Sequence, residues 1–182
     1  MGLRRGFKTE ANQYAREFRQ ELGLEPHAPL CPWNLAEHLA IDVLKLSAFR
    51  EQIPHAVHQL MHVDQKSFSA GTVFSGLKRL IVFNDSHPKG RQASDIIHEL
   101  AHAILGHPPS VPFNDYGCRN LNKEIEEEAN WLGPALLVSE ESALHIVRQR
   151  MNETLAAQYY GCTTSVIRFR LNMTGALRRI RH

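Results

Sequence analysis

The chain has 182 residues, enough for one domain or for one domain with a small appendage. Hydrophobic residues make up 43% and charged residues 22%, which is a globular composition and excludes a disordered or fibrous chain. A formal net charge of +2 is too small to require a nucleic-acid partner. The longest apolar runs span about four residues, whereas a transmembrane helix needs about 20, so we expect no membrane partner.

Two features of the sequence predict a cytoplasmic protein. The N-terminus is polar from Arg4 onward and lacks the apolar centre of a secretory signal. The cysteines, Cys31, Cys118 and Cys162, are far apart and form no Cys-x-x-Cys pair, which favours reduced thiols over disulfides.

Charge is distributed unevenly along the chain. Residues 140–182 contain seven arginines against three glutamates, a net charge of +4 that leaves −2 for the rest. We therefore predict a core over residues 1–139 and a basic helical extension over 140–182. A solvated basic helix face would explain the same asymmetry.

The pattern of apolar residues predicts several helices and a few strands. Tyr14, Phe18 and Leu22 recur at helical spacing, which predicts a helix over residues 9–22 ended by Gly23. A shorter helix is expected over residues 33–40. Three segments have the composition of strands: 41–46, 68–74 and 80–83. Because helices and strands do not alternate regularly, an α+β fold is favoured over a doubly wound one.

Two longer helices are predicted in the second half, over residues 91–105 and 124–138. Pro134 lies inside the second of them and lacks a backbone donor, so we expect a kink or a break near Asn130. Ser139 has the character of an N-cap and predicts the start of a third helix.

His98-Glu99-Leu100-Ala101-His102 forms a His-Glu-x-x-His motif on the first of these helices. Residues four apart share a helix face, so both imidazoles can converge on one zinc ion. Glu99 lies one step around the helix. It cannot be a ligand with them, but it can reach a water at the open coordination position.

A zinc peptidase site needs a third protein ligand, and the second helix offers Glu126, Glu127 and Glu128. The three side chains point about 100° apart, so at most one can face the metal. Glu126 lies at the margin of the apolar stripe and Glu127 points away from it, whereas Glu128 is harder to exclude. Asn130 could orient a ligating imidazole.

At this point the sequence resembles the ImmA/IrrE family of zinc metallopeptidases. The segments that carry the resemblance are 68–74, 79–84, 90–92, 98–107 and Glu126-x-x-Ala129-Asn130-x-Leu132 followed by Leu136-Leu137. The resemblance implies a zincin-like core with a small, mostly antiparallel sheet and two ligand helices. It also implies that Glu126 is the third ligand. Leu132-Gly133 and Ser139 depart from the family pattern, which affects helix packing rather than ligands.

Together these observations predict a zinc-dependent endopeptidase in which Glu99 moves the proton. Candidates for stabilising the oxyanion are Tyr116, His107 and His145. By resemblance, the protein substrate would be a helix-turn-helix transcriptional repressor, cleaved under stress or during induction of a mobile element.

Other histidines are expected to have structural or surface roles. His55, His58 and His62 share a face if their segment is helical, and a polar surface is favoured there over a second metal site. His107 could cap the C-terminus of its helix through the helix dipole, or its ring could approach the cleft.

The C-terminal extension has the spacing of a helix-turn-helix unit, with Ala157, Gly161 and Ile167 at its packing positions. Its second helix would expose polar residues suited to DNA: Thr163, Thr164, Ser165 and Arg168. Proteins of the resembled family often carry such a unit after the peptidase core, where it need not bind DNA, so the resemblance favours packing or substrate docking over DNA binding.

Two alternative functions remain open on the sequence. One is a DNA-binding regulator with structural or sensory zinc, whose duplex binding would depend on salt. The other is a catalytically silent interaction module of the toxin–antitoxin type.

Overall fold

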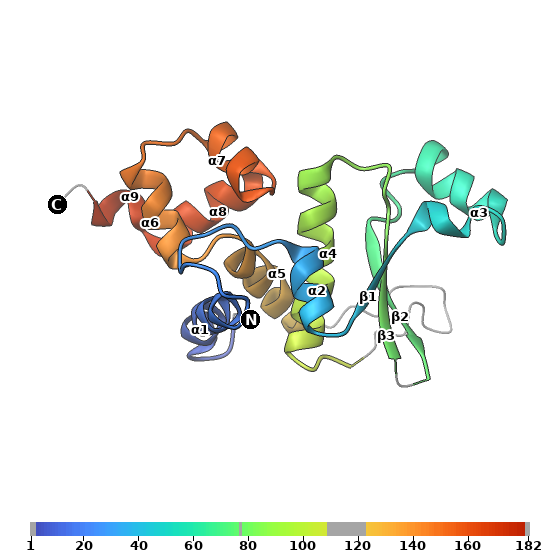
Figure 1. Ribbon diagram of the computed structural model, residues 1–182, viewed down its shortest axis with the longest axis horizontal. Helices are drawn as coiled ribbons and strands as arrows, with labels where there is room; N and C mark the ends of the chain where they lie inside the picture. The colour runs from blue at the N-terminus through green and yellow to red at the C-terminus, as the bar shows by residue number, and fades with distance from the viewer. Residues whose placement is uncertain (1–2, 77, 109–122, 181–182) are drawn as a thin grey trace.

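The computed structural model describes residues 3–76, 78–108 and 123–180. Helices make up most of it, and a small sheet lies at one end of the helical body (Figure 1). The predicted α+β class is confirmed. Within these residues, no helix has the length and the apolar character needed to cross a bilayer.

The first half of the chain contains both helices and strands. In order, its elements are α1 (Phe7–Glu21), α2 (Pro32–His38), β1 (Asp42–Lys45), η1 (Leu46–Phe49), α3 (Pro54–His58), η2 (Gln59–Val63), β2 (Ala70–Ser75) and β3 (Lys78–Phe83). The predicted strands are present with shifts of a few residues at their ends. α2 stops at His38, and the chain then turns at Ala40, which has a φ of 53°.

In the second half, every element among the described residues is a helix. Its elements are α4 (Lys89–Ile104), α5 (Lys123–Leu137), α6 (Glu140–Arg148), α7 (Glu153–Tyr160), α8 (Thr164–Thr174) and α9 (Ala176–Arg179). α6 begins as predicted: the Ser139 hydroxyl accepts a hydrogen bond from the backbone N–H of Ser142.

The sheet is mixed rather than mostly antiparallel. Its order is β1-β3-β2. β2 and β3 form an antiparallel hairpin in which Thr72 lies opposite Ile81, whereas β1 runs parallel to β3 with Val43 opposite Ile81. Parallel neighbours need a long crossover, which the η1–α3–η2 segment supplies before the chain returns through β2. β2 is left at the edge of the sheet.

α4 lies between the sheet on one side and α5 with the C-terminal helices on the other, whereas α3 lies at the sheet end of the molecule (Figure 1). Its buried face includes Ile96, Ile97 and Leu100, which belong to one apolar core with residues of α1, α5 and α8. α5 approaches α4 closely at Gly133, where a Cβ would lie 3.4 Å from Cγ2 of Ile97 and 3.5 Å from Cα of His98. The family departure at Gly133 therefore lies against the backbone of a candidate ligand.

Of the kink or break expected near Asn130, the break was wrong, and the kink stays a prediction. α5 runs as one helix from Lys123 to Leu137 with Pro134 inside it. Proline removes only its own N–H donor. The Pro134 carbonyl still accepts a 2.9 Å hydrogen bond from the N–H of Val138, so the helical pattern resumes at once.

Two buried arginines join α1 and α8 to the C-terminal end of α5. The Arg19 guanidinium donates to the Leu137 carbonyl at 3.2 Å, and that of Arg170 donates to the Val138 carbonyl at 2.8 Å. These carbonyls lie at a helix end, where they have no partner within the helix. Burial lowers the pKa of each arginine to about 10. The predicted division of the chain into a core over residues 1–139 and a helical extension over residues 140–182 stays a prediction.

α7 and α8 form a tight helical hairpin. Gly161 takes a left-handed conformation with a φ of 64°, and the Thr163 hydroxyl caps α8 by accepting from the N–H of Val166. Ala157 and Ile167 are buried, as the spacing predicted. A role for this hairpin in DNA binding stays a prediction.

Candidate metal centre

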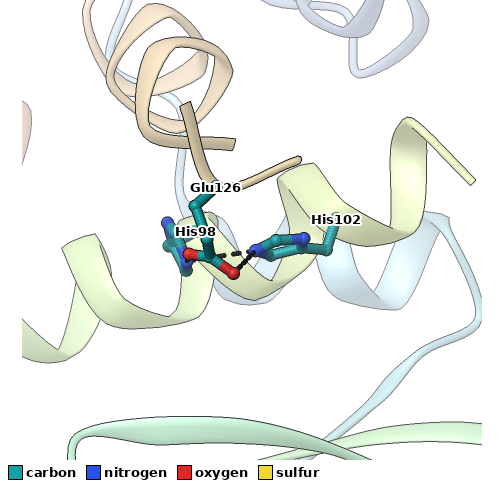
Figure 2. A group of neighbouring side chains, drawn as sticks. All are labelled: His98, His102 and Glu126. Atoms are coloured by element: carbon teal, nitrogen blue, oxygen red, sulfur yellow. Dashed lines mark hydrogen bonds and ion pairs between the residues drawn. The ribbon is translucent and has the colours of Figure 1, made fainter. Parts of the chain in front are cut away.

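The two histidines of the His-Glu-x-x-His motif lie on one face of α4. Their Nε2 atoms are 3.1 Å apart, and the rings meet nearly edge-on at an angle of 78° (Figure 2). This follows from the helix itself, because residues four apart stack on the same side. Both side chains are partly buried, with 28% of the His98 side chain and 16% of the His102 side chain exposed.

Glu126 reaches the two imidazoles from α5. Its Oε2 lies 3.4 Å from Nε2 of His98, and its Oε1 lies 3.5 Å from Nε2 of His102 (Figure 2). Each of the three residues offers a ligand atom, and these atoms lie within 4.8 Å of one another. Over the described ranges, no other three histidines, cysteines or carboxylates are grouped in this way.

The neighbouring carboxylates on α5 point elsewhere. Glu127 faces Lys123 at 3.9 Å, and Glu128 contacts His107 and Arg4. The structure therefore brings Glu126, and neither neighbour, to the paired imidazoles. That these residues bind a metal stays a prediction.

Burial and neighbouring charges shift the pKa values of the three clustered residues in different directions. Burial lowers the pKa of His98, but the hydrogen bond to Glu126 and the charge of Glu99 outweigh it, so the pKa lies above its ordinary 6.5. Burial and the charge of His98 lower the pKa of His102 to about 4. The hydrogen bond to His98 holds the pKa of Glu126 below its usual range.

Glu99 is held by the sheet. The Thr72 hydroxyl on β2 donates a 2.6 Å hydrogen bond to Oε2 of Glu99. The Glu99 charge also acts on His98 and on Arg79, which places the carboxylate near the candidate metal site without its being one of the three clustered ligands. This arrangement suits a base that acts beside a metal.

A pocket of about 420 Å³ lies beside His98 and Glu126, between α4, α5 and α8. Its walls are largely apolar and carry a few polar groups; among the lining residues are Ile97, Pro134, Leu137, Val166, Asp95 and Asn130. Asn130 lies in this wall, and in the described part of the chain it makes no hydrogen bond to either imidazole.

The structure separates the three candidates for oxyanion stabilisation. Tyr116 lies outside the described residues. His145 packs against the rings of His27 and Tyr159. His107 is buried with its Nδ1 2.9 Å from Nδ1 of His102. Of the two candidates that the structure describes, His107 and His145, only His107 contacts one of the three clustered residues. We assign the oxyanion role to none of the three candidates.

The histidines at 55, 58 and 62 are exposed on α3 and η2, in agreement with the predicted polar surface. The rings of His58 and His62 lie 5.3 Å apart. No third ligand joins them within the residues that the structure describes.

Two residues near the centre escaped the sequence analysis. Thr72 was part of a strand pattern, and nothing in that pattern tied its hydroxyl to Glu99. The guanidinium of Arg79, on β3, donates a 3.2 Å hydrogen bond to the His107 carbonyl and lies over the Phe74 ring. Its positive charge contributes to the lowered pKa of His102. Burial lowers the pKa of this guanidinium. Only the pairing of β2 with β3 beside α4 brings these side chains to the site.

The clustered His98, His102 and Glu126 are compatible with a metal site of the kind that metallopeptidases use. Residues 36–172 match the family described as IrrE N-terminal-like domain, Peptidase_M78. The chain therefore belongs to the ImmA/IrrE family of metallopeptidases. A comparison with curated proteins finds no match.

Proposed function

We propose that this protein is a zinc-dependent endopeptidase. The observation that carries the proposal is the approach of Glu126, from a separate helix, to the imidazoles of His98 and His102. Membership of a metallopeptidase family supports the same reaction class.

The donor set fits zinc. Two imidazole nitrogens and one carboxylate oxygen are a ligand set of catalytic zinc sites, which leave the fourth position open. For ligands about 2.05 Å from the ion, the corners of a tetrahedron are about 3.3 Å apart. The two imidazole nitrogens are 3.1 Å apart, and each Glu126 oxygen faces one of them, Oε2 at 3.4 Å from His98 and Oε1 at 3.5 Å from His102. With a single oxygen from Glu126, the three ligand atoms lie within 4.8 Å of one another, so a modest movement of the carboxylate would bring them to these corners.

Bound zinc supplies Lewis-acid polarisation of the scissile carbonyl and acidification of water. Glu99 would accept the proton of the attacking water and deliver it to the departing amine. Thr72 would hold the Glu99 carboxylate in place for both transfers. β2 is an edge strand, and among the described residues no strand pairs with its outer side, where an extended polypeptide would add to the sheet.

The proposed substrate is a protein, and specifically a helix-turn-helix transcriptional repressor cleaved under stress or when a mobile element is induced. The family membership supports this choice of substrate. The pocket beside His98 offers a place for a substrate side chain.

The test compares zinc-loaded parent protein with Glu99→Gln on a proteome-derived peptide library, read by mass spectrometry of new termini. We expect new termini from the parent alone, with equal zinc content in both proteins. An inactive zinc-loaded parent, or equal cleavage by Glu99→Gln, would overturn the proposal. Incubation with a helix-turn-helix repressor encoded beside this gene tests the substrate separately, and an intact repressor overturns only that part.

A second candidate function is DNA binding by the α7–α8 hairpin. Thr164, Ser165 and Arg168 are exposed on α8, which favours it. Arg168, however, is engaged by Glu153 of α7 through contacts of 3.1 and 2.6 Å. DNA binding predicts salt-dependent association with a duplex that weakens on Arg168→Ala. We rank it below peptidase activity.

A further inference from the structure

The outward-facing nitrogen of His102 begins a chain of polar contacts that leads away from the candidate metal centre. Nδ1 of His102 lies 2.9 Å from Nδ1 of His107, and Nε2 of His107 lies 3.3 Å from Oε2 of Glu128. The other Glu128 oxygen accepts a 2.8 Å hydrogen bond from Nε of Arg4. The chain of contacts thus joins a candidate ligand to a carboxylate on the second helix.

The end of α4 explains how His107 reaches this place. Gly106 has a φ of 65°, and the N–H groups of Gly106 and His107 donate to the carbonyls of Ala103 and His102 at 3.1 and 3.0 Å. This is the Schellman pattern, which turns the chain back at a helix C-terminus. His107 is thereby returned beside His102, and only 8% of its side chain is exposed.

Only one placement of protons satisfies every group in this chain of contacts. A nitrogen that faces a metal must carry no proton, so a neutral His102 ligating through Nε2 carries its proton on Nδ1. Nδ1 of His107 must then accept, which leaves the His107 proton on Nε2 to be donated to Glu128. With the proton of His107 on Nδ1 instead, two N–H groups would face each other across 2.9 Å.

We propose that His107 and Glu128 are positioning residues that fix the ring of His102 and its tautomer, and so set the affinity of the site for its metal. The inference rests on the proposed metal centre. Ligating histidines commonly donate their second N–H to a carboxylate or carbonyl. Here a second imidazole stands between the ligand and the carboxylate.

Arg4 adds a smaller contribution from the N-terminal segment. It pairs with Glu128 at 2.8 Å and with Glu10 at 2.7 Å, and about half of its side chain is exposed. Exposed ion pairs contribute little, so the effect should reside mainly in the buried His107.

The experiment measures zinc affinity by competition with a chromophoric chelator, together with the visible spectrum of the Co²⁺ form. His107→Leu fills the space but cannot accept a hydrogen bond from His102, whereas His107→Asn keeps an acceptor near the position of Nδ1. Glu128→Gln removes the charge at the far end. Glu127→Gln is the matched control, because it alters a carboxylate on the same helix that faces Lys123.

We expect His107→Leu to bind zinc about 10- to 100-fold more weakly and to alter the Co²⁺ spectrum. His107→Asn should recover most of the affinity, Glu128→Gln should lose several-fold, and Glu127→Gln should match the parent. Thermal unfolding with chelator present checks that the metal-free variants fold. If His107→Leu does not fold, the comparison of Glu128→Gln with Glu127→Gln decides by the same criterion.

Zinc affinity within about twofold of the parent and an unchanged Co²⁺ spectrum in His107→Leu would overturn the inference. A parent that binds no zinc would overturn both the inference and the proposed function. A parent that binds zinc and variants that bind weakly, without cleavage of any peptide, would overturn the proposed function alone.

Discussion

The Thr72 hydroxyl donates a 2.6 Å hydrogen bond to the carboxylate of Glu99, so the edge strand of the sheet holds the proposed base. Thr72→Val keeps the shape of the side chain and removes this donor. Hydrogen bonds to charged groups contribute about 1.5–3 kcal/mol, so we expect kcat to fall about tenfold or more. Zinc content should not change, since Thr72 contacts none of the three clustered ligands.

Steady-state cleavage of a peptide identified from the library, alongside zinc analysis, checks this prediction. Thr72→Ser restores the hydroxyl and should restore kcat. If Thr72→Val turned over substrate at the parental rate, Thr72 would have no part in holding Glu99.

Zinc analysis after purification without chelator tests the ligand set. His98→Ala and Glu126→Ala each remove one of three donors, and we expect both to lose most of the metal that the parent retains. Glu127→Gln should retain it. Near-stoichiometric zinc in both alanine variants would contradict the assignment of these residues.

Local patterns predicted much of this fold and of its candidate site. The helical positions of His98 and His102 follow from a spacing of four, and a helix is nearly independent of its surroundings in this respect. The parallel pairing of β1 was missed because it depends on the path of a crossover, which includes an unexpected π-helical turn at Gln59–Val63.

The choice among the three α5 glutamates needed tertiary structure. Their positions around the helix left Glu128 open, and only the docking of α5 on α4 separates Glu126 from Glu128. The return of His107 onto His102 likewise needed tertiary structure, because it depends on the backbone geometry of the α4 end at Gly106.

Because α5 approaches α4 closely at Gly133, we expect the stability of the protein to decrease as the side chain at this position becomes larger than alanine. An alanine Cβ would make ordinary contacts of 3.4 and 3.5 Å, and alanine favours a helix by about 1 kcal/mol over glycine, so Gly133→Ala should not destabilise the fold. Gly133→Val adds atoms against His98 and should cost about 1–3 kcal/mol. We also expect Gly133→Val to weaken zinc binding.

Urea unfolding with chelator present measures the stability, and chelator competition measures the zinc affinity. Equal values for Gly133→Val and Gly133→Ala would mean that the helices separate freely at this point.

The two described cysteines should differ sharply in reactivity. Cys31 is exposed, whereas Cys162 is buried, and burial raises the pKa of its thiol to about 12. The thiolate is the reactive form, and at pH 8 the buried Cys162 thiol is almost entirely protonated. Iodoacetamide should therefore label Cys31 and spare Cys162, as read from the separate tryptic peptides.

The raised pKa of Cys162 also predicts how the free energy of unfolding changes at alkaline pH. An unfolded Cys162 would ionise near pH 9, well before the folded one, so its contribution to the free energy of unfolding is complete below that pH and decreases as the pH rises toward 12. We expect labelling of Cys162 to require unfolding. Equal labelling rates at both cysteines in the folded protein would contradict its burial.

Gly90 provides the sharpest test of how the C-terminal helices dock on α4. It lies in the first turn of α4, where a Cβ would be 2.7 Å from the carbonyl oxygen of Cys162 and 2.9 Å from its carbon. These are backbone atoms of the α7–α8 turn and cannot swing aside as a flexible side chain would. Helix propensity alone predicts that Gly90→Ala stabilises the protein by about 1 kcal/mol. We expect the opposite sign, a loss of about 1–3 kcal/mol, because the hairpin must move away.

Gly133→Ala is the matched control, since the same substitution in a helix meets only ordinary contacts there. Urea unfolding of both variants measures the difference, and a Gly90→Ala protein as stable as Gly133→Ala would show that the α7–α8 turn does not rest on α4 in solution.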